Sequence, residues 1–352
     1  MNATVSALSA REMHTAKRSA QALPTPFQLR ARLPLGVDSV ATVERGRNAI
    51  RAIMRGEDSR LLVIAGPCSL HDPIAALEYA QRLAALAPQV SDQLLLVMRA
   101  YVEKPRTTVG WKGLLYDPQL DDSGDMAEGL ALSRQLMLSI TELGLPVATE
   151  LLQPLAAGYL DDLLSWAAIG ARTSESQIHR EMVSGLDLPV GFKNGTDGSL
   201  AIACDAMRSA AHAHQHFGMD EQGRPALIQT QGNADTHLVL RGGHAGPNYQ
   251  PDAVQAACAA LRGQGISTGL MIDCSHANSG KDPLRQPEVL ASVVAQRLAG
   301  QSNIRGVMLE SHLFGGCQPL SPDLQYGVSI TDACLGWSAT EQVLLSAAER
   351  LR

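Results

Sequence analysis

The chain has 352 residues, of which 45% are apolar and 18% are charged. This length and composition predict a globular protein with either two domains or one large barrel carrying insertions. The formal net charge of −6 argues against a protein that mainly coats nucleic acid or anionic membranes, so we predict neither as a partner.

The cysteines and the hydropathy of the chain bear on its location. Six cysteines are scattered without a CxxC pair, which argues against a zinc ribbon and a secreted disulfide framework. No apolar run approaches the roughly 20 residues that a membrane span needs. The first twenty residues contain basic and small polar side chains but lack the apolar core of a secretory signal. We therefore predict a soluble cytoplasmic protein that begins with a flexible or partner-bound arm.

Residues 1–58 precede the first strand-like segment. Three prolines punctuate residues 24–34, and the stretch 39–55 then has helical spacing at Val43, Ile50 and Ile53. We predict that 1–58 form an N-terminal arm and helix, with a role in regulation or oligomerisation, and that 59–352 form the main domain.

From residue 59, short β-branched runs alternate with longer amphipathic stretches, a rhythm that is typical of repeated βα units and a parallel sheet. Between the runs, Asp72 followed by Pro73 predicts the start of a helix, and Gly144 predicts a left-handed helix end. Eight runs are found, at 61–66, 94–99, 145–150, 166–172, 189–193, 238–243, 269–276 and 306–311.

Eight strands with intervening helices predict an α/β fold of the (β/α)8 TIM-barrel type. The excess length is expected in the N-terminal extension and in insertions at 101–124 and 216–236, the latter a β-hairpin before the sixth strand. A doubly wound open sheet is the alternative, but no GxGxxG motif opens a helix after the first strand.

Groups that bind charge stand at or just after the predicted carboxyl ends of nearly all these strands. Barrel enzymes place their active sites at that end, so one small ligand is expected to meet many of these groups. In chain order they are Cys68, Arg99, Glu150, Arg172, Lys193, Arg241, the Asp273 and His276 pair, and Glu310.

These groups form two sets. The cations, joined by Lys104 and Arg106, suit a strongly anionic ligand with one or two phosphates and a carboxylate. Lys193 is also a candidate Schiff-base lysine, although the nearby arginines favour ion pairing. The second set, Cys68, His276 and Glu310 together with Asp332, offers sulfur, nitrogen and oxygen ligands for a divalent transition metal. A buried cysteine that packs as a small apolar side chain is the alternative for Cys68.

Several long motifs resemble those of type I 3-deoxy-D-arabino-heptulosonate 7-phosphate (DAHP) synthases. They occur in the same order over about residues 40 to 345, and strings such as EKPRTTVGWKG and GFKNGTDG are long enough to be specific. The stretch from GFKNGTDGSLA to DCSHANS most resembles the tyrosine-sensitive bacterial isoenzyme. The motifs are GPCSLHDP (66–73), RAYVEKPRTTVGWKG (99–113), IGARTSESQIHRE (169–181), PVGFKNGTDGS (189–199), LRGG (240–243), DCSHANS (273–279), ESHLFGG (310–316) and SITDACLGW (329–337).

The resemblance implies condensation of phosphoenolpyruvate with erythrose 4-phosphate, which opens the shikimate pathway to aromatic amino acids. It also implies one divalent metal ion (Mn, Fe, Co or Zn), feedback by an aromatic amino acid with tyrosine favoured, and a homodimer or homotetramer. Asp187 stands near the expected feedback pocket, where a small residue is expected.

The resemblance also implies a role for each matching residue. Cys68, His276, Glu310 and Asp332 would bind the metal. Arg172, Arg241 and the amide of Ala171 would hold the phosphate of phosphoenolpyruvate, and Arg99, Lys104 and Lys193 its carboxylate. Pro105, Arg106 and Thr107 would contact the second sugar phosphate. Glu150 would act through a water beside the enol carbon, and Lys104, Glu150 and His276 are the predicted catalytic residues.

Three other functions fit the same residues. A sister synthase would use arabinose 5-phosphate or a hexosamine as its aldose. A lysine-dependent aldolase would use Lys193 covalently and ignore chelators. A phosphometabolite sensor would bind phosphoenolpyruvate without turnover, but it would have no need of the metal ligands.

Overall fold

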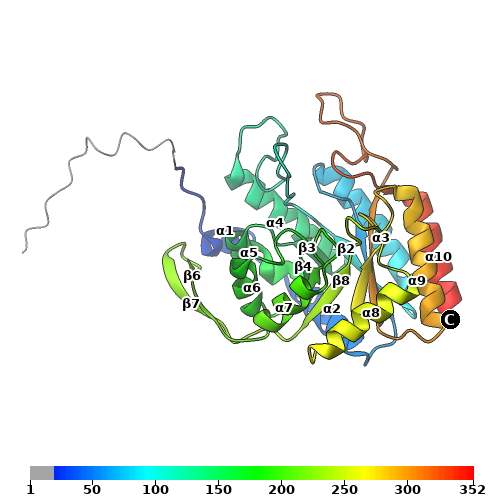
Figure 1. The fold of residues 1–352 in the computed structure, drawn as a ribbon. Helices are drawn as coiled ribbons and strands as arrows, with labels where there is room; N and C mark the ends of the chain where they lie inside the picture. Colours follow the sequence, from blue (N-terminus) through cyan, green and yellow to red (C-terminus); the bar gives the residue numbers. More distant parts are fainter. Residues whose placement is uncertain (1–19) are drawn as a thin grey trace, which may run out of the picture.

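Eight parallel strands close into a barrel in the computed structural model, which describes residues 20–352 (Figure 1). The barrel closes because β1 pairs with β10, and this confirms the predicted TIM barrel and excludes the open sheet. Its strands are β1 (Leu61–Gly66), β2 (Leu94–Arg99), β3 (Val147–Glu150), β4 (Leu164–Ile169), β5 (Val190–Lys193), β8 (Thr236–Leu240), β9 (Leu270–Asp273) and β10 (Ile304–His312).

A helix follows each barrel strand and packs outside the sheet (Figure 1). Local sequence sets the ends of these helices: the Asp72 carboxylate caps α3 by accepting from the amides of Ile74 and Ala75, and Gly144 adopts φ 81° just after α4. The helices are α3 (Pro73–Val90), α4 (Met126–Glu142), α5 (Pro154–Leu160), α6 (Gln177–Ser184), α7 (Ala201–Ala210), α8 (Pro251–Gly263), α9 (Gln286–Leu298) and α10 (Trp337–Leu351). Short 3-10 turns occur at Asp161–Leu163 and Pro283–Arg285, and β11 (Leu335–Gly336) pairs with β10.

The predicted hairpin lies before the sixth barrel strand. Its strands β6 (Gln215–Met219) and β7 (Pro225–Gln229) pair antiparallel and project to one side of the barrel (Figure 1). The short helix α1 (Pro26–Arg32) lies beside the hairpin, because the Phe27 amide donates to the Glu221 carbonyl at 2.9 Å. Hairpin, α1 and α5 therefore form one wall next to the barrel.

Helix α2 (Val37–Arg55) closes the amino-terminal end of the barrel. Its Ile50 and Ile53 are buried against inward-facing strand side chains such as Leu62 and Trp166. Gly46 permits this approach, since a Cβ there would overlap Ser165 and Pro146. Part of the predicted extension is thus packed into the barrel base, whereas residues 1–19 of the predicted arm lie outside the described residues. Among residues 20–352, no helix is long and apolar enough to cross a membrane.

Candidate active site

Three of the predicted metal ligands meet at the carboxyl-terminal mouth of the barrel. The ligand atoms of Cys68, Glu310 and Asp332 all lie within 4.8 Å of one another, and Cys68 Sγ is 3.7 Å from Asp332 Oδ2. Cys68 follows β1, Glu310 lies in β10, and Asp332 precedes β11. One thiol and two carboxylates form a donor set that fits a divalent transition metal.

His276 lies in the same cavity as Glu310 and Asp332, but its ring nitrogens fall outside the 4.8 Å group formed within the described chain. Its Nδ1 is 2.9 Å from Asp273 Oδ2 and 2.7 Å from Ser275 Oγ. A carboxylate on one ring nitrogen is the usual way to orient a histidine whose other nitrogen binds a metal.

Arg99 lies wholly buried beneath this cluster. Its guanidinium donates to the carbonyls of Pro67 and Cys68 and to Glu310 Oε1 at 2.8 Å, and it stacks 3.5 Å above the ring of Tyr101. Burial opposes ionisation of Glu310, but the charges of His276 and Arg99 lower its pKa to about 2. The carboxylate is therefore ionised at neutral pH and able to bind a cation.

Lys104 supplies a second positive charge beside the thiol. Its Nζ lies 3.1 Å from Cys68 Sγ and 3.2 Å from the Cys68 carbonyl oxygen. Burial and the Glu310 carboxylate raise the pKa of the Cys68 thiol. The thiolate that a metal requires thus depends on nearby positive charge, which Lys104 and the metal itself would supply.

An adjoining cavity of about 70 Å³ gathers most of the predicted substrate contacts. It brings cationic and acidic groups together next to the metal ligands, an arrangement suited to binding an anion and moving a proton. Thr196, which the sequence analysis did not single out, also faces it. The predicted residues that line it are Pro105, Glu150, Ala171, Arg172, Lys193, Arg241 and His276.

Lys193 is held in an ion pair. Its Nζ lies 3.2 Å from Asp273 Oδ2, and both side chains are almost completely buried. Although burial opposes ionisation, His276 and Lys193 hold the pKa of Asp273 well below its usual range. This ion pair with a buried carboxylate favours an ion-pairing role for Lys193 over that of a Schiff-base nucleophile.

The structure does not bring every predicted residue to these cavities. Arg106 and Thr107 are exposed on the loop after Lys104 and line neither cavity. Conversely, sequence reasoning missed Tyr101 beneath Arg99, and it missed Gln286, whose side-chain amide bonds both the N–H and the carbonyl of Glu310. No local pattern reveals these partners. Gln286 lies far from Glu310 in the chain, and Tyr101 comes after the end of β2, where the alternation of a strand no longer predicts which side chains face inward.

Glu103, which precedes Lys104, is a further missed residue. Its carboxylate accepts from the amides of Leu152 and Gln153 and from the Tyr116 hydroxyl. Burial raises the pKa of Glu103 to about 7. Glu103 therefore fastens the loop that carries Lys104 to the segment that follows β3.

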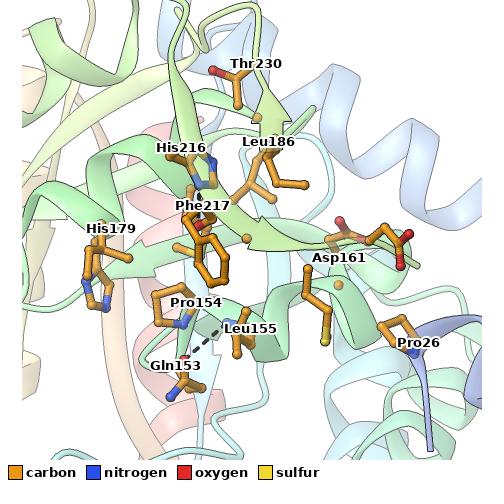
Figure 2. Close-up of a pocket in the computed structure, with 18 of the residues that line it drawn as sticks. Pro26, Gln153, Pro154, Leu155, Asp161, His179, Leu186, His216, Phe217 and Thr230 are labelled. Carbon is orange, nitrogen blue, oxygen red and sulfur yellow. Dashed lines mark hydrogen bonds between the residues drawn. The ribbon is translucent and has the colours of Figure 1, made fainter. Parts of the chain in front are cut away.

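A third and larger cavity, of about 590 Å³, lies outside the barrel between the hairpin, α1, α5 and α6 (Figure 2). Figure 2 shows the ring of Phe217 extending from β6 toward Pro154 and Leu155. Asp187 does not line this cavity: its carboxylate is 87% exposed and pairs with Arg51 at 2.6 Å. The apolar lining includes Pro154, Leu155, Ile178, Met182, Leu186, Phe217 and Ile228.

Comparison with known proteins gives a consistent result. The sequence pattern of the DAHP synthetase I family matches residues 34–345. A Tyr-sensitive phospho-2-dehydro-3-deoxyheptonate aldolase of Escherichia coli (strain K12) is 54% identical over 328 residues, or 92% of each chain. The Phe-sensitive enzyme of that strain is 48% identical over 93% of this chain and 94% of its own. The solved phospho-2-dehydro-3-deoxyheptonate aldolase of Francisella tularensis SCHU S4 superposes with a TM-score of 0.93 at 42% identity, covering 96% of this chain and all of the other.

Proposed function

The chain belongs to the DAHP synthetase I family, and we propose that the barrel mouth described above is where it condenses phosphoenolpyruvate with erythrose 4-phosphate. The reaction yields DAHP and inorganic phosphate and begins aromatic amino acid biosynthesis. The observation that carries the assignment of the site is the cavity that seven predicted residues share, next to the cluster of Cys68, Glu310 and Asp332.

The cations of the mouth would hold the two anionic substrates in contact. Arg172, Arg241 and the amide of Ala171 would bind the phosphate of phosphoenolpyruvate, while Lys193 and Lys104 would face its carboxylate. Buried Arg99 would act behind them through Glu310. Fixed positive groups in a site of low dielectric offset the repulsion between two phosphorylated substrates, and they need no reorganisation during the reaction.

Cys68, Glu310 and Asp332, with His276 beside them, would hold one divalent metal ion. When bound, such an ion supplies a Lewis acid for the aldehyde of erythrose 4-phosphate. Glu150 lines the substrate cavity and would orient or deprotonate the water that adds at C2 of phosphoenolpyruvate. Lys104 would deliver a proton to the new alkoxide.

Release of inorganic phosphate tests this function. We expect phosphate release from phosphoenolpyruvate and erythrose 4-phosphate, its loss on treatment with a chelator, and its return with a divalent metal. Turnover with arabinose 5-phosphate instead would identify the sister synthase. Activity that survives the chelator and is lost with borohydride would identify a lysine-dependent aldolase, and phosphoenolpyruvate binding without turnover would identify a sensor.

The 590 Å³ cavity is our proposed site for an aromatic amino acid effector, with tyrosine favoured. Its apolar lining and the aromatic Phe217 suit an aromatic side chain, and relatives named Tyr-sensitive support tyrosine. Phe217→Ala should weaken tyrosine inhibition by about tenfold, because aromatic pairs contribute up to about 1.5 kcal/mol. Phe314→Ala, whose ring lies outside this cavity, is the control. If tyrosine inhibits the Phe217→Ala and Phe314→Ala variants equally, this cavity is not the effector site.

The remaining proposals concern the whole protein. Residues 1–58 would serve regulation or oligomerisation, and α1, which faces the larger cavity through Pro26 and Arg30, supports the regulatory role. We expect a homodimer or homotetramer that works in the cytoplasm, where its six unpaired cysteines would stay reduced. Light scattering of the protein with and without residues 1–24 compares the two oligomeric states, and it thereby tests whether the arm serves oligomerisation.

A further inference from the structure

A basic cavity lies at the amino-terminal end of the barrel, opposite the mouth. It has a volume of about 210 Å³ and lies between the end of α2, the end of α8 and the starts of β9 and β10. None of the residues that line it, all within the described chain, is acidic. Its polar lining consists of Arg55, Arg262 and Arg305 with Ser267, Thr268 and Asn303.

Arg305 occupies a position that two glycines keep open. A Cβ at Gly56 would overlap its guanidinium, and a Cβ at Gly269 would overlap the stem of its side chain. Gly56 also has φ 83°, which only glycine adopts without strain. The two glycines thus provide a fitted place for the Arg305 side chain.

Two of the three arginines that line this cavity have no carboxylate partner in the described part of the chain. Among residues 20–352, Arg262 and Arg305 make no ion pair, whereas Arg55 pairs with Asp235, which also contacts Arg51. An arginine is usually placed in a partly enclosed site to meet an anion. Because the chain as a whole carries a charge of −6, this local excess of cations needs a cause.

A neighbouring arginine adds to this positive potential. Burial, together with the charge of Arg305, lowers the pKa of Arg297, and burial also lowers the pKa of Arg305. Arg297 Nε is buried and makes no hydrogen bond within the described chain. An anion in the cavity would relieve the repulsion between these guanidinium groups.

We propose that this cavity binds a phosphate-bearing small molecule. Arg262 and Arg305 would contact the phosphate oxygens, with Arg55 beside them, and the hydroxyls of Ser267 and Thr268 would donate further hydrogen bonds. Guanidinium groups match the phosphate dianion in both charge and geometry. A volume of 210 Å³ lies below the roughly 300 Å³ of ordinary cofactor pockets, so the ligand is inorganic phosphate or a small phosphate monoester.

The cavity and the mouth lie at opposite ends of the barrel, and they share no lining residue. Phosphate binding at the mouth must therefore be removed before the second site is measured. The full-length Arg172→Gln, Arg241→Gln double variant serves as the background, since it lacks both guanidinium groups that line the substrate cavity.

Isothermal titration with inorganic phosphate and, separately, with glycerol 3-phosphate tests the proposal. In the background variant we expect one bound phosphate per chain. Adding Arg305→Gln should weaken binding by at least about tenfold, because one charge-assisted contact contributes about 1.5–3 kcal/mol. Arg262→Gln should weaken it similarly. Arg45→Gln, which removes an exposed arginine of α2 outside the cavity, should change it by less than about twofold.

The two ligands distinguish the source of the phosphate. Tighter binding of glycerol 3-phosphate identifies an organic phosphate, and tighter binding of inorganic phosphate identifies the free ion. Absence of binding in the background variant overturns the proposal. Equal binding before and after both Arg305→Gln and Arg262→Gln overturns it as well. Turnover is not measured, so the result is independent of the function proposed for the mouth.

Discussion

The two ends of the barrel both gather positive side chains, but they place them in opposite surroundings. At the mouth, Arg99 pairs with Glu310 at 2.8 Å and Lys193 pairs with Asp273 at 3.2 Å, and these side chains are almost completely buried. At the base, within residues 20–352, Arg262 and Arg305 have no acidic partner and are partly or largely exposed. Arg99 and Lys193 at the mouth are thus held in a fixed geometry, whereas the charges of Arg262 and Arg305 at the base remain available to an anion.

This difference shows how burial decides what a charge does. A buried ion pair is costly to break, because removal of one partner leaves an uncompensated charge in a medium of low dielectric. An exposed charge is screened by water, and its loss changes stability little. Matched substitutions at the two ends therefore test whether burial accounts for this difference.

The largest difference is expected between two buried cysteines. Cys68→Ser at the mouth should lower kcat/KM by at least about 1,000-fold, or about 4 kcal/mol, because it removes a thiolate from the proposed metal site. Cys258→Ser, at the edge of the basic cavity, should leave activity within about twofold. Steady-state assays with saturating metal make the comparison, and similar rates for both variants would mean that Cys68 only packs.

The next difference concerns stability. Arg99→Met leaves Glu310 buried without its partner, so we expect the free energy of unfolding to fall by about 3–5 kcal/mol. Arg305→Met at the base should change it by less than about 1 kcal/mol. Urea unfolding of the metal-free proteins measures both. The contrast between the two ends disappears if the two variants unfold at the same urea concentration.

A buried histidine inside the barrel, between its two ends, predicts how the stability of the protein depends on pH. His237 is buried and accepts a hydrogen bond from Trp166 Nε1 at 3.1 Å, and burial lowers its pKa to about 3. The unfolded chain binds this proton near pH 6.5, so stability is full above pH 6.5 and falls as the pH drops toward 3. Between pH 6.5 and pH 4 the loss should be about 3 kcal/mol.

The substitution His237→Gln keeps a hydrogen-bond acceptor for Trp166 but cannot be protonated. Unfolding of this variant should therefore depend less on pH over the same interval. An unchanged pH dependence would assign the acid sensitivity to other groups, such as buried His312, whose pKa is lowered to about 4 chiefly by burial.

The smallest effect is expected for Asp187, the position where the resemblance led us to expect a small residue. Its carboxylate is largely exposed and pairs with Arg51, so Asp187→Ser should cost less than about 0.5 kcal/mol of stability. It should also leave the response to tyrosine unchanged, because Asp187 does not line the larger cavity. Inhibition curves for the two proteins that differ by more than about threefold would place Asp187 in the effector site after all.

The sequence predicted the barrel well, because alternating β-branched runs and capped helices are local signals. The first two strands begin and end where the runs at 61–66 and 94–99 predict. Charged residues at strand ends were also predictable, since parallel strands bring their carboxyl ends to one rim.

The rest depends on contacts that no local pattern encodes. The closure of the base by Ile50 and Ile53, the ring of Tyr101 beneath Arg99 and the seat of Arg305 between two glycines all join segments distant in the chain. The orientation of His276 by Asp273 belongs to this group as well, because spacing alone does not say which ring nitrogen faces the carboxylate.

Metal content after removal of excess ion is the most direct test of the mouth as a metal-dependent site. Wild-type protein should retain about one divalent ion per chain, and Cys68→Ser should retain less than about a tenth of that. Wild-type protein that holds no metal after chelation and still condenses the two substrates at its full rate would contradict the account.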